Sequence, residues 1–257
     1  MKSLTSSFRD PSGFVFKYDE KIYRQINKCF ANEFDSFISS GLCSALIEKG
    51  LLISHEDVDT PDVPQTENCH RIILPKQIPY ISYPYEWSFS QLKDAAILTL
   101  KVQAQALKYG FSLKDASSYN VQFIGSELKF IDTLSFEPYK EGEPWIAYRQ
   151  FCQHFLAPLA LMAYVDIDLA KLLSNYIDGI PLSLASKLLP NRTRLNYGLQ
   201  IHLHLHAKIQ KAHSDSANSA ESAVEKKSIA KLTLKGQRAI IEGLASVVNR
   251  LEWKPPK

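Results

Sequence analysis

Three side chains that carry oxygen ligands fall within a short part of the sequence. Asp115 is followed five positions later by Asn120, and Asp132 comes after two short apolar runs at residues 121–124 and 128–131. A Gly-Ser-Glu turn separates the two runs, which is the signal of a β-hairpin. Because a hairpin brings its ends together, we expect Asn120 and Asp132 to lie side by side, with Asp115 on the loop just before them.

Carboxylate and amide oxygens suit Mg²⁺, which proteins usually hold with one or two side chains together with substrate phosphates. Asn120 and Asp132 would supply these side chains, and Asp115 would orient or deprotonate a hydroxyl group. Phosphoryl transfer needs such an arrangement, because positioning and neutralisation of charge supply most of its rate. The alternative is that Asp115 is a turn residue, Asn120 caps a strand and Asp132 is a surface acid.

This order of residues resembles the protein-kinase-like superfamily, above all its small-molecule branch of aminoglycoside- and choline-kinase-like enzymes. Their catalytic loop has Asp, four residues and Asn, and is followed by a hairpin and a metal-binding Asp. The resemblance implies an α+β fold of two lobes, with a small antiparallel β lobe and a larger, mainly helical lobe. It also implies ATP and Mg²⁺ as cofactors, Asp115 as the catalytic residue, and Asn120 and Asp132 as metal ligands.

Apolar spacing and turn residues place the lobes along the chain. We expect the small lobe at residues 1–82, the connector at 83–90 and the helical lobe at 91–257. The strongest helical pattern runs from residue 90 to residue 109, directly before the catalytic loop. Residues 214–228 are small and polar with one core-forming valine, which predicts a flexible segment.

The first 26 residues are expected to form three strands. By the resemblance, the loop at residues 10–13 covers the nucleotide phosphates, and Gly13 is its single glycine. Arg24 stands on the third strand where the superfamily has a lysine, and an arginine can hold phosphate bidentately. The helical stretch that follows carries the acid expected to pair with that base, either Glu33 or Asp35. The alternatives are a plain turn, a solvent-facing arginine and a solvated acidic face.

Residues 55–69 are acidic and proline-containing, which predicts a loop, and residues 71–74 and 78–83 have the composition of strands. The connector then begins at an aromatic sequence. By the resemblance its backbone would bind the base of the nucleotide. Tyr83 and Tyr85 would line an apolar slot for that base or pack the interface between the lobes.

Composition indicates an ordinary soluble globular protein, with 45% hydrophobic and 22% charged residues. The formal net charge of +3 is too small to indicate a nucleic-acid partner or an anionic membrane surface. We find no run long enough to cross a bilayer and no signal peptide. The four cysteines are scattered, which predicts reduced thiols and a cytoplasmic location.

Several phrases, among them SYPYEWSF, LKDASSYNVQF and PWIAYRQFCQHFLAPL, add a second resemblance. They are similar to the N-terminal region of bacterial nodulation-type class I SAM-dependent methyltransferase proteins, over roughly residues 8–164. In those proteins the region precedes a methyltransferase domain. This chain has no Asp/Glu-x-Gly-x-Gly-x-Gly signature, so that domain is expected to be absent, and the ending WKPPK would suit a linker at a domain boundary.

Three functional hypotheses follow. The first is an ATP- and Mg²⁺-dependent phosphotransferase that acts on a small molecule or a carrier-bound substrate, because no long activation segment follows Asp132. The second is a non-catalytic kinase-like module that binds a ligand on behalf of an attached C-terminal methyltransferase domain. The third is part of a SAM-dependent methyltransferase, which the missing glycine-rich signature disfavours.

Overall fold

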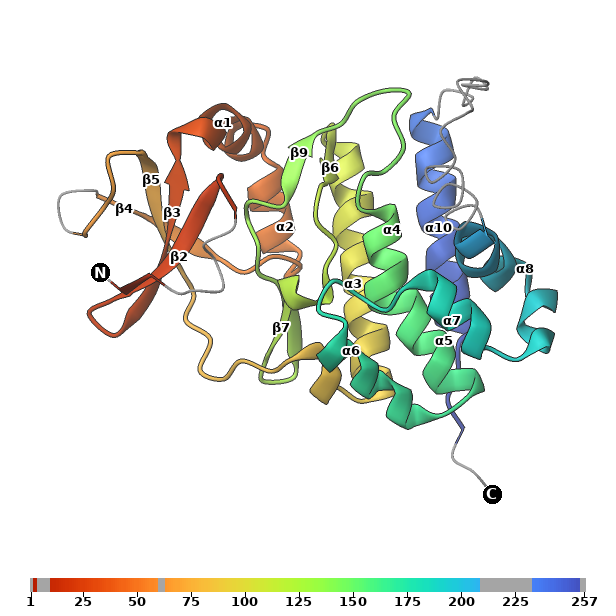
Figure 1. Ribbon diagram of the computed structural model, residues 1–257. Helices are drawn as coiled ribbons and strands as arrows, with labels where there is room; N and C mark the ends of the chain where they lie inside the picture. The colour runs from red at the N-terminus through yellow and green to blue at the C-terminus, as the bar shows by residue number, and fades with distance from the viewer. Residues whose placement is uncertain (1, 4–9, 60–62, 209–232, 255–257) are drawn as a thin grey trace, which may run out of the picture.

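The computed structural model describes residues 2–3, 10–59, 63–208 and 233–254. A small antiparallel sheet lies at one end of the molecule and a larger group of helices at the other, with α1, α2 and the short strands between them (Figure 1). This arrangement confirms the predicted α+β fold class, with a small β lobe and a larger helical lobe. Among the described residues, no helix is long and apolar enough to span a bilayer.

Five antiparallel strands form the sheet of the small lobe, in the order β1-β2-β3-β5-β4. Their bounds are β1 Lys2–Ser3, β2 Gly13–Tyr18, β3 Lys21–Asn27, β4 His55–Val58 and β5 Cys69–Pro75. Alternate residues of β3 and β5 face two apolar clusters: Tyr23 and Ile72 pack with Phe16, whereas Ile26 and Ile73 pack with Phe30, Phe34 and Leu134. The first strand expected at residues 6–8 lies outside the described residues.

Two predictions for this sheet were wrong. The acidic stretch expected to be a loop contains strand β4, which pairs with β5, and residues 78–83 are not a strand. Composition misled in both places. An edge strand has one free side and can carry charged residues. The apolar run at 78–83 contains one proline and precedes another, and each proline lacks the N–H that a sheet partner requires.

Helices α1 (Ala31–Ser39) and α2 (Leu42–Glu48) follow β3 and lie at the junction of the lobes. Gly41 separates them with a φ of 78°, a left-handed conformation that favours glycine. Phe37 of α1 stacks on Phe136, with ring centroids 4.6 Å apart. The helix that follows β3 is therefore packed directly against the short strand that contains Phe136.

The long helix α3 (Phe89–Lys108) begins after Ser88, whose hydroxyl accepts a hydrogen bond from the backbone N–H of Gln91. Strand β6 (Phe111–Leu113) follows and pairs with β9 (Phe136–Pro138). Between them, the predicted hairpin is confirmed as β7 (Val121–Ile124) and β8 (Glu127–Phe130). Gly125 begins its two-residue turn with a φ of 64°.

The hairpin is attached to the small-lobe side as well as to the helical lobe. The backbone N–H of Phe130 donates to the carbonyl of Leu51, and that of Ile53 donates to the carbonyl of Phe130, at 2.8 and 2.9 Å. These bonds join β8 to the segment that leaves α2. The strand that leads to Asp132 is thereby fixed relative to both lobes.

The rest of the described helical lobe shares one apolar core with α3. Helix α5 runs through this core, and most of its side chains are buried. The elements of this part of the lobe are α4 (Tyr148–Phe151), a π-helical segment (Cys152–Leu156), α5 (Ala157–Tyr164), α6 (Leu172–Asn175), α7 (Leu182–Leu188), α8 (Tyr197–Leu199), a second π-helical segment (Gln200–Leu205) and α10 (Leu234–Arg250). One-turn 3₁₀ segments lie at Lys28–Phe30, Pro84–Glu86, Ser118–Asn120, Ile167–Lys171 and Asn191–Leu195.

Candidate functional site

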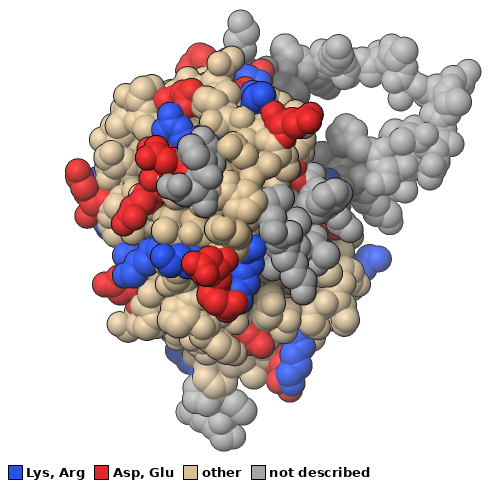
Figure 2. Space-filling model, turned by 90° about the vertical axis from the view of Figure 1, so that its left-hand side faces the viewer, with Lys and Arg blue, Asp and Glu red and all other residues tan. Residues whose placement is uncertain are grey.

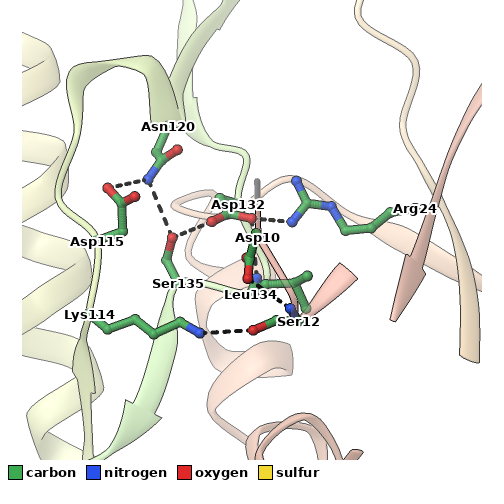
Figure 3. Close-up of polar contacts among 9 residues, drawn as sticks. All are labelled: Asp10, Ser12, Arg24, Lys114, Asp115, Asn120, Asp132, Leu134 and Ser135. Carbon is green, nitrogen blue, oxygen red and sulfur yellow. Dashed lines mark hydrogen bonds and ion pairs between the residues drawn. The ribbon is translucent and has the colours of Figure 1, made fainter. Parts of the chain in front are cut away.

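Five polar side chains form one chain of contacts at the junction of the lobes (Figure 3). The amide nitrogen of Asn120 donates to Oδ1 of Asp115 at 2.9 Å and to Oγ of Ser135 at 3.3 Å. The hydroxyl of Ser135 donates to Asp132, and the guanidinium of Arg24 forms an ion pair with Asp132. The three residues singled out from the sequence therefore belong to one network.

Backbone pairing explains why these residues meet. The N–H of Ile131 donates to the carbonyl of Asn120 at 2.8 Å, which holds the two ends of the hairpin together. The N–H of Lys114 donates to the carbonyl of Ser135 at 2.8 Å, which extends the β6–β9 pairing up to the loop that carries Asp115. Asn120 and Asp132 are near neighbours as expected, but their side chains are linked through Ser135.

Asp115 is largely shielded from water, and burial raises its pKa above the ordinary value of 3.8. The charge of Asp132 raises the pKa further, whereas hydrogen bonds from Ser117, Gln150 and Asn120 lower it. The backbone N–H of Ser117 donates to Asp115 Oδ1 at 2.8 Å, and this bond fixes the carboxylate in place. A carboxylate held in this way, with a raised pKa, can accept a proton from a nearby hydroxyl group.

Asp132 has the opposite electrostatic environment. Burial alone would raise its pKa, but Arg24 and the hydrogen bonds from Ser135 and the backbone of Leu134 outweigh burial and hold the pKa below 3.8. The side chain of Asp132 is 19% exposed and that of Arg24 15%, so water screens the ion pair only weakly. Asp132 is therefore ionised at neutral pH, with Arg24 as its counter-ion.

Arg24 lies on β3 between β2 and β5, opposite Val15 and Ile73. Both acids that were expected to pair with it are described, and neither forms an ion pair with it. Asp35 instead contacts His70 and Arg71, at 3.0 and 3.4 Å. The reason is geometric. Neighbouring helical positions differ by about 100°, so Asp35, which follows the buried Phe34, is directed to His70 and Arg71 of β5.

Figure 2 shows this end of the molecule, where Lys and Arg side chains alternate with Asp and Glu. Arg71, for example, lies 3.4 Å from both Asp35 and Asp57. No broad field of one sign forms on the face shown, so the charges there are largely balanced locally.

Gly13 begins β2 and packs closely against the backbone of Gln25 and the side chain of Leu134. A Cβ atom at this position would lie 2.2 Å from the backbone oxygen of Gln25 and 2.8 Å from Cδ1 of Leu134. The glycine is therefore required for the close approach of the loop at residues 10–13 to the segment that follows Asp132. Its sequence-based assignment to phosphate binding stays a prediction.

Gly13→Ala is expected to destabilise the protein by about 1–3 kcal/mol, because the backbone of β3 must move to make room. Thermal or urea unfolding measures the change. Gly243→Ala in α10 is the matched control: its Cβ would lie at ordinary contact distance, 3.7 Å from His202 Nε2. That substitution should stabilise the helix by up to about 1 kcal/mol. Equal effects of the two substitutions would show that Gly13 is not tightly packed.

Side chains occupy backbone groups at the start of the connector and directly before it. The buried amide of Gln122 on β7 accepts from the N–H of Ser82 at 3.1 Å and donates to its carbonyl at 2.9 Å. The N–H of Tyr83 donates to Glu86 at 2.7 Å. Tyr83 and Tyr85 stack on each other, with centroids 5.4 Å apart, and Tyr83 is 44% exposed. The tyrosines thus form a stacked pair within the connector.

Comparison with known proteins supports one of the two resemblances. The chain is 38% identical over 209 residues to the nodulation protein NoeA of Rhizobium meliloti strain 1021. The match covers 80% of this chain and 43% of NoeA, so the chain spans less than half the length of the curated relative it matches. No family model matches the sequence. The structure of vaccinia related kinase 3 aligns with a TM-score of 0.43 and 11% identity, over 97% of this chain and 87% of that chain.

The similarity to NoeA confirms the nodulation-protein part of the resemblance. The kinase-like part stands on the order of elements in this structure: a five-stranded sheet, a helix pair, a long helix, the loop with Asp115 and Asn120, and the hairpin before Asp132. Along the chain, the helix pair stands between the third and fourth strands, and the long helix follows the fifth.

Asn120 and Asp132 carry the donor types that Mg²⁺ prefers. Asn120 makes both of its contacts in the network with its amide nitrogen, which leaves the carbonyl oxygen as a ligand. Asp132 would coordinate through the oxygen that now faces Arg24. Within the described residues, no group of three or more His, Cys, Asp or Glu side chains could hold a metal without further ligands. The residues therefore fit a cation whose shell is completed by water and phosphate.

His154 supports the loop of the site from beneath. Its Nδ1 lies 3.1 Å from Oγ of Ser118, and Tyr119 packs edge-on against its ring. Burial lowers the pKa of His154 from 6.5 to about 4. The folded protein therefore takes up this proton at a lower pH than the unfolded chain. The contribution of His154 to stability is full above pH 6.5 and is lost as the pH falls toward 4.

His154→Gln is expected to flatten the pH dependence of stability between pH 6.5 and 4. The wild type should lose about 3 kcal/mol more than the variant over this range, taking 1.36 kcal/mol per pKa unit. Urea unfolding at several pH values measures the difference. Parallel curves for the two proteins would mean that His154 does not titrate differently on folding.

Ser135, Gln150 and Gln122 are parts of the site that the sequence did not reveal. Ser135 joins Asn120 to Asp132, and the side chain of Gln150 accepts from the backbone N–H of Ala116 at 2.7 Å. Ser135 alone had a local signal, because a serine three residues after an Asp often completes a turn. The two glutamines form hydrogen bonds with residues 34 and 40 positions away in the sequence, so no local pattern indicates these contacts.

Proposed function

We propose that this chain is a Mg²⁺- and ATP-dependent phosphotransferase domain that acts on the hydroxyl group of a small or carrier-bound substrate. The observation that carries the proposal is the continuous network of Asp115, Asn120, Ser135, Asp132 and Arg24. Phosphoryl transfer needs a cation site, a counter-charge for phosphate and a residue that orients the nucleophile. The network contains one candidate for each role.

The roles divide by position. Asp115, with its raised pKa, would accept the proton of the attacking hydroxyl group. Asn120 and Asp132 would hold Mg²⁺, which would neutralise charge on the phosphates. Arg24 would turn from Asp132 to a phosphate oxygen once the cation is present, because both partners of Arg24 are anionic oxygens. In this proposal the Arg24–Asp132 ion pair belongs to the ligand-free state.

Calorimetric titration with Mg-ATP tests the proposal. We expect measurable binding to the wild type and at least a tenfold loss for Asp132→Ala. The control is Asp57→Ala, which removes an exposed carboxylate on β4 that contacts Arg71. Absence of Mg-ATP binding to the wild type, or unchanged binding to Asp132→Ala, would refute the proposal.

The second candidate is a non-catalytic kinase-like module, and two observations favour it. Arg24 covers one oxygen of the carboxylate that should bind the cation, and Gln122 occupies both backbone groups of Ser82, directly before the connector. NoeA is longer than this chain, so such a module could serve a further domain, such as a methyltransferase, in longer relatives. Mg²⁺-dependent ATP hydrolysis that is lost in Asp115→Ala would exclude this candidate. Binding without turnover would establish it.

A further inference from the structure

We propose that Lys114 binds an anionic group of the ligand, beside Asp115. This inference rests on the proposed function, because the anion considered is a phosphate of the nucleotide or of the product. Lys114 follows β6 and directly precedes Asp115, and its backbone N–H is bound to the carbonyl of Ser135. In Figure 3 its side chain leaves the catalytic loop on the side away from Asn120 and reaches Ser12 of the small lobe.

The ammonium group of Lys114 has weak partners. It lies 3.4 Å from Oγ of Ser12 and 4.1 Å from the centre of the Phe30 ring. Neither partner carries a negative charge. Among the residues that the structure describes, no carboxylate lies within ion-pair distance, 4.0 Å, of Lys114, and Asp10 instead accepts from the backbone N–H of Ser12 at 2.8 Å. Lys114 is therefore a half-buried cation that has no counter-ion in the described part of the chain.

A half-buried charge is unfavourable unless another group compensates it. The ring of Phe30 compensates part of this cost through its quadrupole, but a cation–π contact is weaker than pairing with an anion. Arg24, the other cation at the site, is already paired with Asp132. Lys114 is thus a positive charge beside this network that remains for an incoming anion.

The position of Lys114 also fits this role. Gly13 and Leu134 bring the loop at residues 10–13 into contact with the segment after Asp132, so Ser12, Lys114 and Asp132 belong to one packed region. Lys114 and Arg24 approach that region from different elements, the catalytic loop and β3 (Figure 3). Two cations placed in this way can hold different oxygens of one polyphosphate. The ammonium group of Lys114 acts as a point charge, and the planar guanidinium of Arg24 binds oxygens in pairs.

The test compares binding of Mg-ATP and of inorganic tripolyphosphate with MgCl₂ to the wild type and to three variants. Lys114→Met removes the charge and keeps the apolar stem that packs on Phe30, and Lys114→Arg keeps the charge. Lys101→Met removes an exposed charge from α3 and is the control. We expect Lys114→Met to bind both ligands at least tenfold more weakly, Lys114→Arg to restore most of the affinity, and Lys101→Met to match the wild type.

Lysine labelling of the wild type provides a measurement that needs no variant. Reductive methylation followed by mass spectrometry should show that tripolyphosphate protects Lys114 and leaves Lys101 unprotected. Equal labelling of Lys114 with and without the ligand, or wild-type affinity in Lys114→Met, would overturn the inference while the proposed function stands. Protection of Lys114 without phosphoryl transfer would support the inference and overturn the proposed function. If the wild type binds neither ligand, both are wrong.

Discussion

Arg24→Ala should lower the free energy of unfolding by about 2–3 kcal/mol, because it leaves the mostly buried carboxylate of Asp132 without a counter-charge. Urea unfolding at pH 7 measures this loss. Lys17→Ala is a suitable control, since it breaks the exposed ion pair with Glu20, with side chains 43% and 89% exposed, and should change the stability far less than Arg24→Ala does. Arg24→Met combined with Asp132→Asn should recover most of the stability, because no charge is then left unpaired.

The same ion pair gives a signature in acid. The folded-state pKa of Asp132 lies below 3.8, so the stabilisation by Arg24 is fully present above pH 3.8 and is lost as the pH falls through the lower folded-state pKa. Arg24→Ala should therefore differ from the wild type at neutral pH and approach it in strong acid. A difference that stays constant down to low pH would show that the contribution of Arg24 is not electrostatic.

Asp115→Asn should lower the rate of phosphoryl transfer by about 10²–10⁴, because an amide cannot accept the proton of the attacking hydroxyl group. The substitution keeps an oxygen that can accept from Asn120 and Ser117, so we expect Mg-ATP affinity to change only slightly. Steady-state ATP hydrolysis or transfer to an alcohol measures the rate. Asp94→Asn, at an exposed position of α3, serves as the control.

The pH profile separates a proton acceptor from a merely structural acid. Because the pKa of Asp115 is raised above 3.8, the wild-type rate should rise with pH through that raised pKa, as the carboxylate becomes ionised. The residual rate of Asp115→Asn should lack this rise. A variant with wild-type rate, or with an unchanged profile, would remove Asp115 from the chemistry.

Local sequence signals were sufficient for the elements that carry the site. The turn at Gly125 and the apolar runs on either side of it predicted the hairpin, and Ser88 and Gly110 bracket the long helix that precedes the loop. These features depend on residues close together in the sequence, where backbone conformation and side-chain spacing decide the outcome. The meeting of Asn120 and Asp132 followed from the hairpin alone.

The partners of these residues depend on packing between distant segments. Arg24 pairs with the carboxylate of Asp132, 108 residues later in the chain, and Gln122 binds the backbone of Ser82, 40 residues earlier. No local pattern distinguishes such contacts from those of exposed polar residues. For the same reason the pairing of Asp35 with His70 and Arg71 emerged only from the way in which α1 packs on the sheet.

A crystal structure of the protein with Mg-ATP tests the central claim most directly. The proposal requires electron density for a cation between the side-chain oxygens of Asn120 and Asp132, with Arg24 moved from Asp132 to a phosphate oxygen and Asp115 facing the γ-phosphate. If the Arg24–Asp132 ion pair is intact in the complex and the nucleotide is absent or bound elsewhere, the network is structural and the proposed phosphotransferase function is wrong.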